Sequence, residues 1–170
     1  MMNKRIDLAR EAAGVARYHT ARLIHGESVG EHSFNVCNLI LLMTNGEASR
    51  ALLIAALTHD MGEPAVGDVP SPIKKMMPDT VKVIMNCMEE AAVRVIHPHT
   101  PTISDVEKKL LKLADNLDGL LKCRDELRLG NRNIRTIGDR YVQYIQELTE
   151  HWNDYRLFAE QCIYLYRKEL

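Results

Sequence analysis

The stretch LTHDMGEPAVGDVP, residues 57–70, places four titratable side chains at the end of an apolar run. His59 and Asp60 are adjacent, and two further carboxylates, Glu63 and Asp68, follow within the next eight positions. This pattern is typical of a helix end with a solvated acidic turn. It is also typical of a metal site, in which an imidazole and a carboxylate bind a divalent ion and further carboxylates lie beside it. These residues alone leave both interpretations open.

Two more residues with metal-ligand chemistry fall on segments that should be helical. His32 lies in the first turn of a helix that begins at Ser28, with Glu31 in the position that a capping box requires. Asp115 lies in LLKLADNLDGLL, within or beside an apolar stripe. Because a buried carboxylate is costly without a partner, a bound cation would offset that cost. Two imidazoles and two carboxylates form a mixed shell that suits Mn, Fe, Co, Ni or Zn.

Helical periodicity dominates the elements that would position these side chains, and no alternating strand pattern is found, so the sequence predicts an all-α fold. Predicted helices cover residues 3–14, 28–46, 47–60, 81–97 and 104–130, with a last long helix at about 134–168. Residues 15–28 are predicted to be an irregular connector, and residues 64–79, with four prolines, a loop. Gly62 and Pro64 indicate a helix end after Asp60, which would let two adjacent side chains approach one ion.

Length, charge and cysteine usage bound the class of protein. A chain of 170 residues predicts a single domain, residues 1–170, with its core at about 14–131. The formal net charge of -1 gives no positive field that would attract nucleic acid or an acidic membrane surface. The sequence contains no run of 18 apolar residues, so no membrane span is predicted. The four cysteines stand singly inside predicted helices. They are interpreted as reduced core residues, which suits a cytoplasmic protein.

The order His, His-Asp, distant Asp on an all-helical chain resembles the HD-domain metal-dependent phosphohydrolase superfamily. The resemblance is closest to bacterial 5'-deoxynucleotidases and to the small HD phosphohydrolases of phages. The matching stretches are RY at 17–18, ESVGEHS at 27–33, HDMGEPAVGDVPSPIK at 59–74 and ADNLDGLLKCRDELRLGN at 114–131. The resemblance implies an HD-domain helical bundle and covers most of residues 14–131.

Carried over by position, the resemblance implies four metal ligands, which are His32, His59, Asp60 and Asp115. It implies catalytic or substrate-positioning carboxylates at Glu63 and Asp68, and it leaves open which of them is the acid and which the base. A divalent cofactor such as Co, Mn or Zn would then neutralise phosphate charge and activate water for attack.

The resemblance also implies residues that contact the substrate, some before and some after the metal ligands in the sequence. Arg17 would contact the phosphate. Tyr18 stands where related deoxynucleotidases have Trp, so a flat ring could exclude a 2'-hydroxyl, but the smaller side chain leaves the strictness of that selection open. Lys74 aligns with a lysine of the family, and with Lys75 it either contacts further phosphates or forms a solvated pair.

The function expected from this resemblance is hydrolysis at the 5' α-phosphate of a deoxynucleotide, converting a deoxynucleoside monophosphate to deoxynucleoside and phosphate. One alternative is a deoxynucleoside triphosphohydrolase that releases tripolyphosphate, and another is a non-catalytic nucleotide-binding module. The expected partners are a small deoxynucleotide and a second copy of the chain, in a homodimer or larger homo-oligomer. Nucleic acid and membranes are not expected partners. The helix at 134–168 would cover the core or the dimer partner.

Overall fold

The computed structural model describes residues 2–67 and 69–170, so the prediction for Asp68 lies outside the described residues. Helices make up most of the described chain. The elements are α1 (Met2–Ala13), β1 (Ala16–Arg17), β2 (Glu27–Ser28), α2 (Val29–Met43), α3 (Arg50–Thr58), η1 (Glu63–Ala65), α4 (Ser71–Met76), α5 (Asp79–Ile96), α6 (Asp105–Arg128), η2 (Arg132–Ile134), α7 (Arg135–Thr149) and α8 (Asn153–Arg167).

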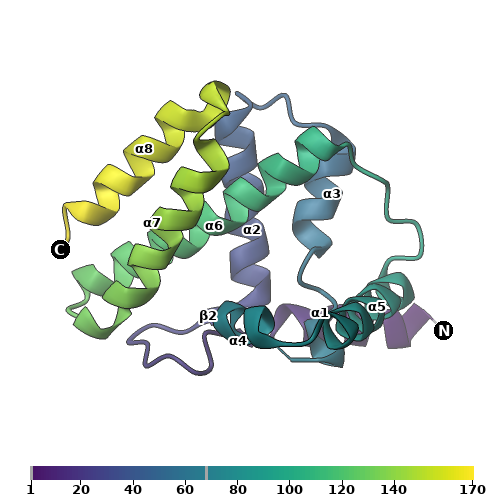
Figure 1. The fold of residues 1–170 in the computed structure, drawn as a ribbon. Coiled ribbons are helices and arrows are strands. Elements are labelled where there is room, and N and C mark those ends of the chain that lie inside the picture. Colours follow the sequence, from purple (N-terminus) through teal and green to yellow (C-terminus); the bar gives the residue numbers. More distant parts are fainter. Residues whose placement is uncertain (1, 68) are drawn as a thin grey trace.

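Helix α6 is the central element of this all-α fold. It contacts α2 and α3 on one side and α7 and α8 on the other, while α5 contacts α1 and η1 instead. Figure 1 shows α6 crossing the middle of the molecule, with α7 and α8 beside it and with α1, α4 and α5 gathered at one end. Because α6 carries Leu113, Leu117 and Leu120 with no exposed surface, it supplies the middle of the buried apolar cluster.

Local sequence signals begin the helices that matter for the site. The Ser104 hydroxyl accepts from the Glu107 amide and the Glu107 carboxylate accepts from the Ser104 amide, so α6 begins with the predicted capping box. The Ser28 hydroxyl accepts from the Glu31 amide at 3.2 Å at the start of α2. These caps place His32 in the first turn of α2, as the sequence predicts.

A short antiparallel hairpin replaces the irregular connector predicted for residues 15–28. Ala16 pairs with Ser28, and Arg17 pairs with Glu27. Each strand is two residues long, which is too short for an alternating pattern to be visible in the sequence. The pairing makes Arg17 and Glu27 direct neighbours and fixes the direction in which the Arg17 side chain leaves the backbone.

The predicted loop at residues 64–79 contains helical structure. The 3-10 helix η1 starts at Glu63, and α4 spans Ser71–Met76. Proline is tolerated in the first turn of a helix because the amide it lacks would have no helical partner there, so a proline-rich segment can still begin a helix. Lys74 and Lys75 therefore lie on a helix and not on a loop.

The predicted continuous helix at 134–168 is wrong, because α7 ends at Thr149 and α8 begins at Asn153. An unbroken helix of that length would span about 50 Å, well beyond the roughly 36 Å of α6. The reversal at residues 150–152 lets both α7 and α8 pack on α6 and on one another, as Figure 1 shows. No proline or glycine marks this break, so the local sequence gives no warning of it.

The core also differs from the prediction for cysteine. Cys37, Cys123 and Cys162 are buried, but Cys87 on α5 is exposed. None of the helices in residues 2–67 and 69–170 combines the length and the apolar character that a membrane crossing needs.

Candidate metal centre and adjoining pocket

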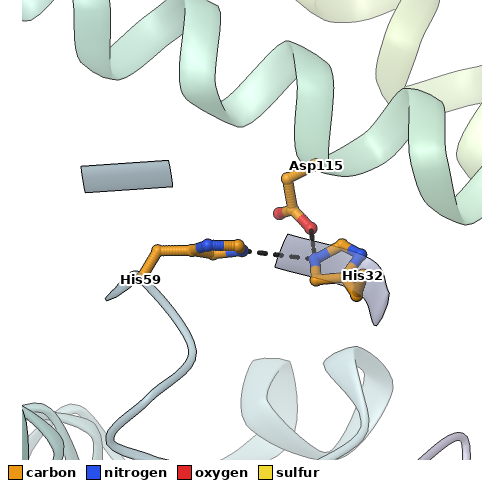
Figure 2. A group of neighbouring side chains, drawn as sticks. All are labelled: His32, His59 and Asp115. Carbon is orange, nitrogen blue, oxygen red and sulfur yellow. Dashed lines mark hydrogen bonds and ion pairs between the residues drawn. The ribbon is translucent and has the colours of Figure 1, made fainter. Parts of the chain in front are cut away.

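Side chains from α2, from the turn after α3 and from α6 converge at one point. His32 Nε2 lies 3.2 Å from His59 Nε2, 3.3 Å from Asp115 Oδ1 and 3.5 Å from Asp60 Oδ2. His59 Nε2 is also 3.5 Å from the same Asp60 oxygen. Figure 2 shows His32, His59 and Asp115 pointing toward one another. The structure therefore brings together the four side chains that the sequence predicts as ligands.

The turn after α3 is held by a close approach of two backbones. His59 caps α3, and the chain then turns through Gly62 into η1. A Cβ atom on Gly62 would lie 2.6 Å from the carbonyl oxygen of Glu89 on α5, so only glycine fits here without a backbone shift. This contact explains how the adjacent His59 and Asp60 both reach the cluster, as a helix end after Asp60 predicts.

The hydrogen bonds of the two rings decide which nitrogens face each other. His59 Nδ1 lies 2.8 Å from the carbonyl oxygen of Ala56, which can only accept, so Nδ1 carries the proton. His32 Nδ1 lies 2.6 Å from Asp118 Oδ2, which likewise favours the proton on Nδ1. When both rings are neutral, the form in which histidine binds a metal, both Nε2 atoms present lone pairs 3.2 Å apart. Two lone pairs at this distance repel, and a shared cation removes the repulsion, so the donor set fits a divalent metal ion.

The carboxylates of the cluster have cationic partners of their own. Asp60 Oδ2 accepts from Arg17 Nη1 at 2.6 Å, and Asp115 Oδ2 accepts from Lys112 Nζ at 2.7 Å. Burial alone would raise the pKa of Asp115, but the hydrogen bond to His32 and the charge of Lys112 hold that pKa well below its usual range. Burial would lower the pKa of His32, but Asp115 and Asp118 raise it to about 9. The cluster is thus built for positive charge at its centre.

Arg17 joins the hairpin to the cluster. Its Nε lies 3.2 Å from Glu27 Oε2, its cross-strand partner, while Nη1 bonds Asp60. The guanidinium is largely buried, and the Asp60 carboxylate outweighs the effect of burial and raises the pKa of Arg17 above its usual value. Arg17 is therefore a fixed charge beside the cluster, not the surface residue that a connector position suggests.

A pocket of about 310 Å³ opens directly beside the cluster. Asp60, Asp115, Arg17 and Tyr18 line it, together with the buried Glu63. Of the two lysines predicted to contact phosphate, Lys74 lines the pocket, and its Nζ lies 3.7 Å from Glu89 Oε1. Lys75 instead contacts Tyr144, its ammonium 4.0 Å from the centre of the tyrosine ring. The pocket has a volume suited to a small ligand.

Helix α7 forms one wall of the pocket, which the sequence did not predict. The last helix was expected to cover the core or a dimer partner. Four side chains at i, i+3, i+4 and i+7 form this wall, and they are Ile137, Arg140, Tyr141 and Tyr144. Lys112 and Asn116 of α6 also line the pocket, as do Val69 and Pro70. Their helical spacing shows that they share one face of α7, but only the fold shows what that face covers.

Two acidic residues next to the cluster were also missed. Asp118 orients His32, and Glu27 pairs with Arg17. The spacing of Asp115 and Asp118, three residues apart on α6, is the one signal in the sequence that could have indicated a shared face.

The chain matches the YfbR-like family, described as 5'-deoxynucleotidase YfbR-like, over residues 7–165. Proteins named 5'-deoxynucleotidase YfbR from Escherichia coli O1:K1 and from Escherichia coli strain SMS-3-5 are each 30% identical to it, over 71% of this chain and 71% of theirs.

Two solved structures share the fold. The PH0347 protein from Pyrococcus horikoshii OT3 superposes with a TM-score of 0.70 at 20% identity, over 97% of this chain and 99% of that one. An HD-domain phosphohydrolase (lin2634) from Listeria innocua superposes with a TM-score of 0.64 at 22% identity, over 99% of this chain and 87% of that one. The predicted HD-domain helical bundle is thereby confirmed. The chain belongs to the YfbR-like family of HD-domain phosphohydrolases, and it is a hydrolase.

Proposed function

We propose that the protein hydrolyses deoxynucleoside 5'-monophosphates to deoxynucleosides and phosphate, with a divalent metal ion held by His32, His59, Asp60 and Asp115. The observation that carries this proposal is the pair of Nε2 atoms 3.2 Å apart, with two carboxylates around them, beside a pocket that Arg17 enters. The names of the Escherichia coli relatives support a deoxynucleoside monophosphate as the substrate.

The donor set has two imidazole nitrogens and two carboxylates, which suits a divalent transition metal such as Co, Mn or Zn. Such an ion, when bound, supplies positive charge for a phosphate oxygen and lowers the pKa of water. Asp60 and Asp115 each accept a hydrogen bond from a cationic side chain. The pKa of Asp115 is held well below its usual range, so this carboxylate needs no proton release before binding.

The residues around the cluster have separate tasks in the reaction. Arg17, fixed by Glu27 and Asp60, directs its charge at the phosphate and orients it. Glu63 is buried on η1 and lines the pocket, where it takes a proton from the attacking water. A bond then forms between the water oxygen and phosphorus, the bond from phosphorus to the 5'-oxygen breaks, and the leaving oxygen gains a proton. Asp68 is proposed for that last transfer on its place in the motif alone.

A triphosphohydrolase acting on deoxynucleoside triphosphates is the second candidate. Three cationic side chains besides Arg17 line the pocket, and they are Lys74, Lys112 and Arg140. Lys112 is committed to Asp115 and Lys74 lies near Glu89, whereas Arg140 has no ion pair with any residue in 2–67 or 69–170. One uncommitted cation favours the monophosphate, because three linked phosphates carry more charge than it can balance.

A product assay separates the two candidates. Protein stripped with a chelator is reloaded with Co, Mn or Zn in parallel and offered dAMP or dATP, and phosphate is resolved from tripolyphosphate. We expect phosphate from dAMP, little product from dATP, and none without metal. Tripolyphosphate from dATP would instead establish the second candidate.

The His59→Ala variant tests the metal site in the same assay, with His151→Ala as its control because that histidine is 88% exposed in its side chain and remote from the cluster. We expect loss of metal binding and activity in the first variant only. Wild-type protein that yields no product with any metal, yet binds nucleotide, would contradict hydrolysis and support a binding module.

We further predict a cytoplasmic homodimer or larger homo-oligomer built from single-domain subunits. Exposed apolar side chains on α5 and α8, such as Ile84 at 59% and Leu157 at 68%, offer surface for such a contact. Sedimentation at several protein concentrations measures the oligomeric state directly.

A further inference from the structure

The hydroxyl oxygens of Tyr18 and Tyr141 lie 2.9 Å apart and form a hydrogen bond between residues 123 positions apart in the chain. Both rings line the pocket beside the metal cluster. Tyr18 follows β1 directly and has a φ of +55°, in the left-handed region that residues other than glycine rarely adopt. An unfavourable backbone conformation at a pocket wall persists where tertiary contacts hold it, and the Tyr141 hydroxyl is such a contact.

Tyr141 is itself seated in a gap on α6. A Cβ atom on Gly119 would lie 2.6 Å from the Tyr141 hydroxyl oxygen, and closer still to its ring, so the phenol occupies the place of a side chain at position 119. Gly119 is four residues after Asp115, and residues at this spacing share one face of a helix. The Tyr141 ring is thus held about one helical turn from the metal cluster by a glycine that leaves room for it.

The position of Arg17 decides which part of a nucleotide meets the two rings. Arg17 bonds Asp60 of the cluster, so a 5'-phosphate at the cluster lies at Arg17, and Tyr18 is the next residue in the chain. The group attached to a 5'-phosphate is the sugar. With the 5'-phosphate at the cluster, as proposed above, the Tyr18 and Tyr141 pair would face the sugar, because both rings line the same pocket as Arg17.

We propose that Tyr141 is a specificity-determining residue of this enzyme, which fixes Tyr18 through their hydroxyl pair and so sets the space available beside the sugar. This inference rests on the proposed function, because it places the phosphate at the cluster. The two hydroxyls bond each other and the Tyr141 ring packs against Gly119. This wall of the pocket therefore cannot move away from an additional sugar hydroxyl. Removing the hydrogen bond between Tyr18 and Tyr141 lets the Tyr18 ring move and makes room for the 2'-hydroxyl of ribose.

The test is the ratio of kcat/KM for dAMP to that for AMP, measured on one preparation of each variant. Tyr141→Phe keeps the ring and removes the bond to Tyr18, and we expect the ratio to fall about fivefold, the size of one hydrogen bond. Gly119→Ala displaces the Tyr141 ring and should lower the ratio further. Tyr164→Phe on α8, at an exposed and remote position, is the matched control and should leave the ratio unchanged.

A double-mutant cycle separates this specificity role from a purely structural one. If the two hydroxyls act only through each other, Tyr18→Phe, Tyr141→Phe and the double variant share one lowered ratio, while metal affinity stays at the wild-type value and Tm falls by the same few degrees in all three. An unchanged ratio in Tyr141→Phe, or fully additive effects in the double variant, overturns the proposal.

The failure of this inference is distinguishable from failure of the proposed function. Wild-type protein that releases phosphate from dAMP, with equal ratios in all variants, overturns the role of Tyr141 alone. Wild-type protein that hydrolyses no nucleotide with any metal overturns both. If dATP is the substrate, the same ratios are measured with dATP and ATP and carry the same meaning.

Discussion

Asp118 Oδ2 lies 2.6 Å from His32 Nδ1, and both side chains are buried within the bundle. Asp118 is three residues after Asp115, whose Oδ1 lies 3.3 Å from the other nitrogen of the same ring. One face of α6 thus contacts both nitrogens of His32, so the helix that supplies one candidate metal ligand also orients another.

This arrangement predicts that Asp118 governs metal affinity without touching the metal. Asp118→Asn removes the charge that holds the His32 proton on Nδ1, and partners of this kind contribute about 10-fold to 100-fold in metal affinity. We expect about a 10-fold loss, because the asparagine oxygen still accepts. Calorimetric titration of stripped protein with Mn or Co measures it. Asp125→Asn, on the same helix with a half-exposed side chain, is the control, and equal affinities in all three proteins would contradict the role of Asp118.

The fully buried Glu126 on α6 predicts a second effect, on the loop behind Arg17 and Tyr18. Its carboxylate accepts from the backbone amides of Ile24 and His25 and from the Asn131 side chain. Glu126→Gln places a donor against these donors, and we expect a loss of about 2 to 3 kcal/mol in the free energy of unfolding. Urea denaturation measures the loss.

The control for Glu126 is Glu160→Gln, because Glu160 is an exposed residue that pairs with Arg156 on the surface of α8. A surface change of this kind should stay within about 0.5 kcal/mol of wild type. A Glu126→Gln variant as stable as Glu160→Gln would show that the loop is held by other contacts.

Glu27 predicts a pH dependence of stability in the metal-free protein. It is 5% exposed, and burial together with the charge of Asp118 raises its pKa from 4.5 to about 7, although Arg17 acts in the opposite direction. Between these values the folded state binds more proton than the unfolded state, so the contribution of Glu27 is present below pH 4.5 and is lost as the pH rises to 7.

Glu27→Gln removes this titration. The stability of the variant relative to wild type should therefore rise by about 1.4 kcal/mol per pH unit across that window. Urea denaturation at pH 5, 6 and 7 in the presence of a chelator measures the difference. Two parallel curves would show that Glu27 keeps an ordinary pKa in the fold.

The cysteines predict a simple accessibility result. Cys87 is exposed, whereas Cys37, Cys123 and Cys162 are buried, and burial raises the pKa of Cys162 to about 11. A thiol reagent should therefore modify one cysteine quickly in the native protein and the other three only after unfolding. Cys87→Ser should abolish the fast phase. A fast phase of more than one thiol would contradict this packing.

The sequence by itself determined the features that depend on neighbouring residues. Ser104 and Glu107 begin α6 because their side chains bond each other's backbone. Gly62 and Pro64 predict a helix end close to His59, and α3 ends at Thr58. The order of His32, His59, Asp60 and Asp115 was enough to predict one cluster, because each stands at a helix start, a helix end or beside an apolar stripe. The family follows from that same order.

Only the tertiary structure decided what depends on residues far apart in the chain. The break after Thr149 has no local breaker and exists because α7 and α8 both gain by packing on α6. The α7 wall of the pocket, the contact of Asp118 with His32 and the Tyr18 to Tyr141 bond all join distant segments. Local propensity acts over a few residues, whereas burial and electrostatics act over distances that only the folded chain defines.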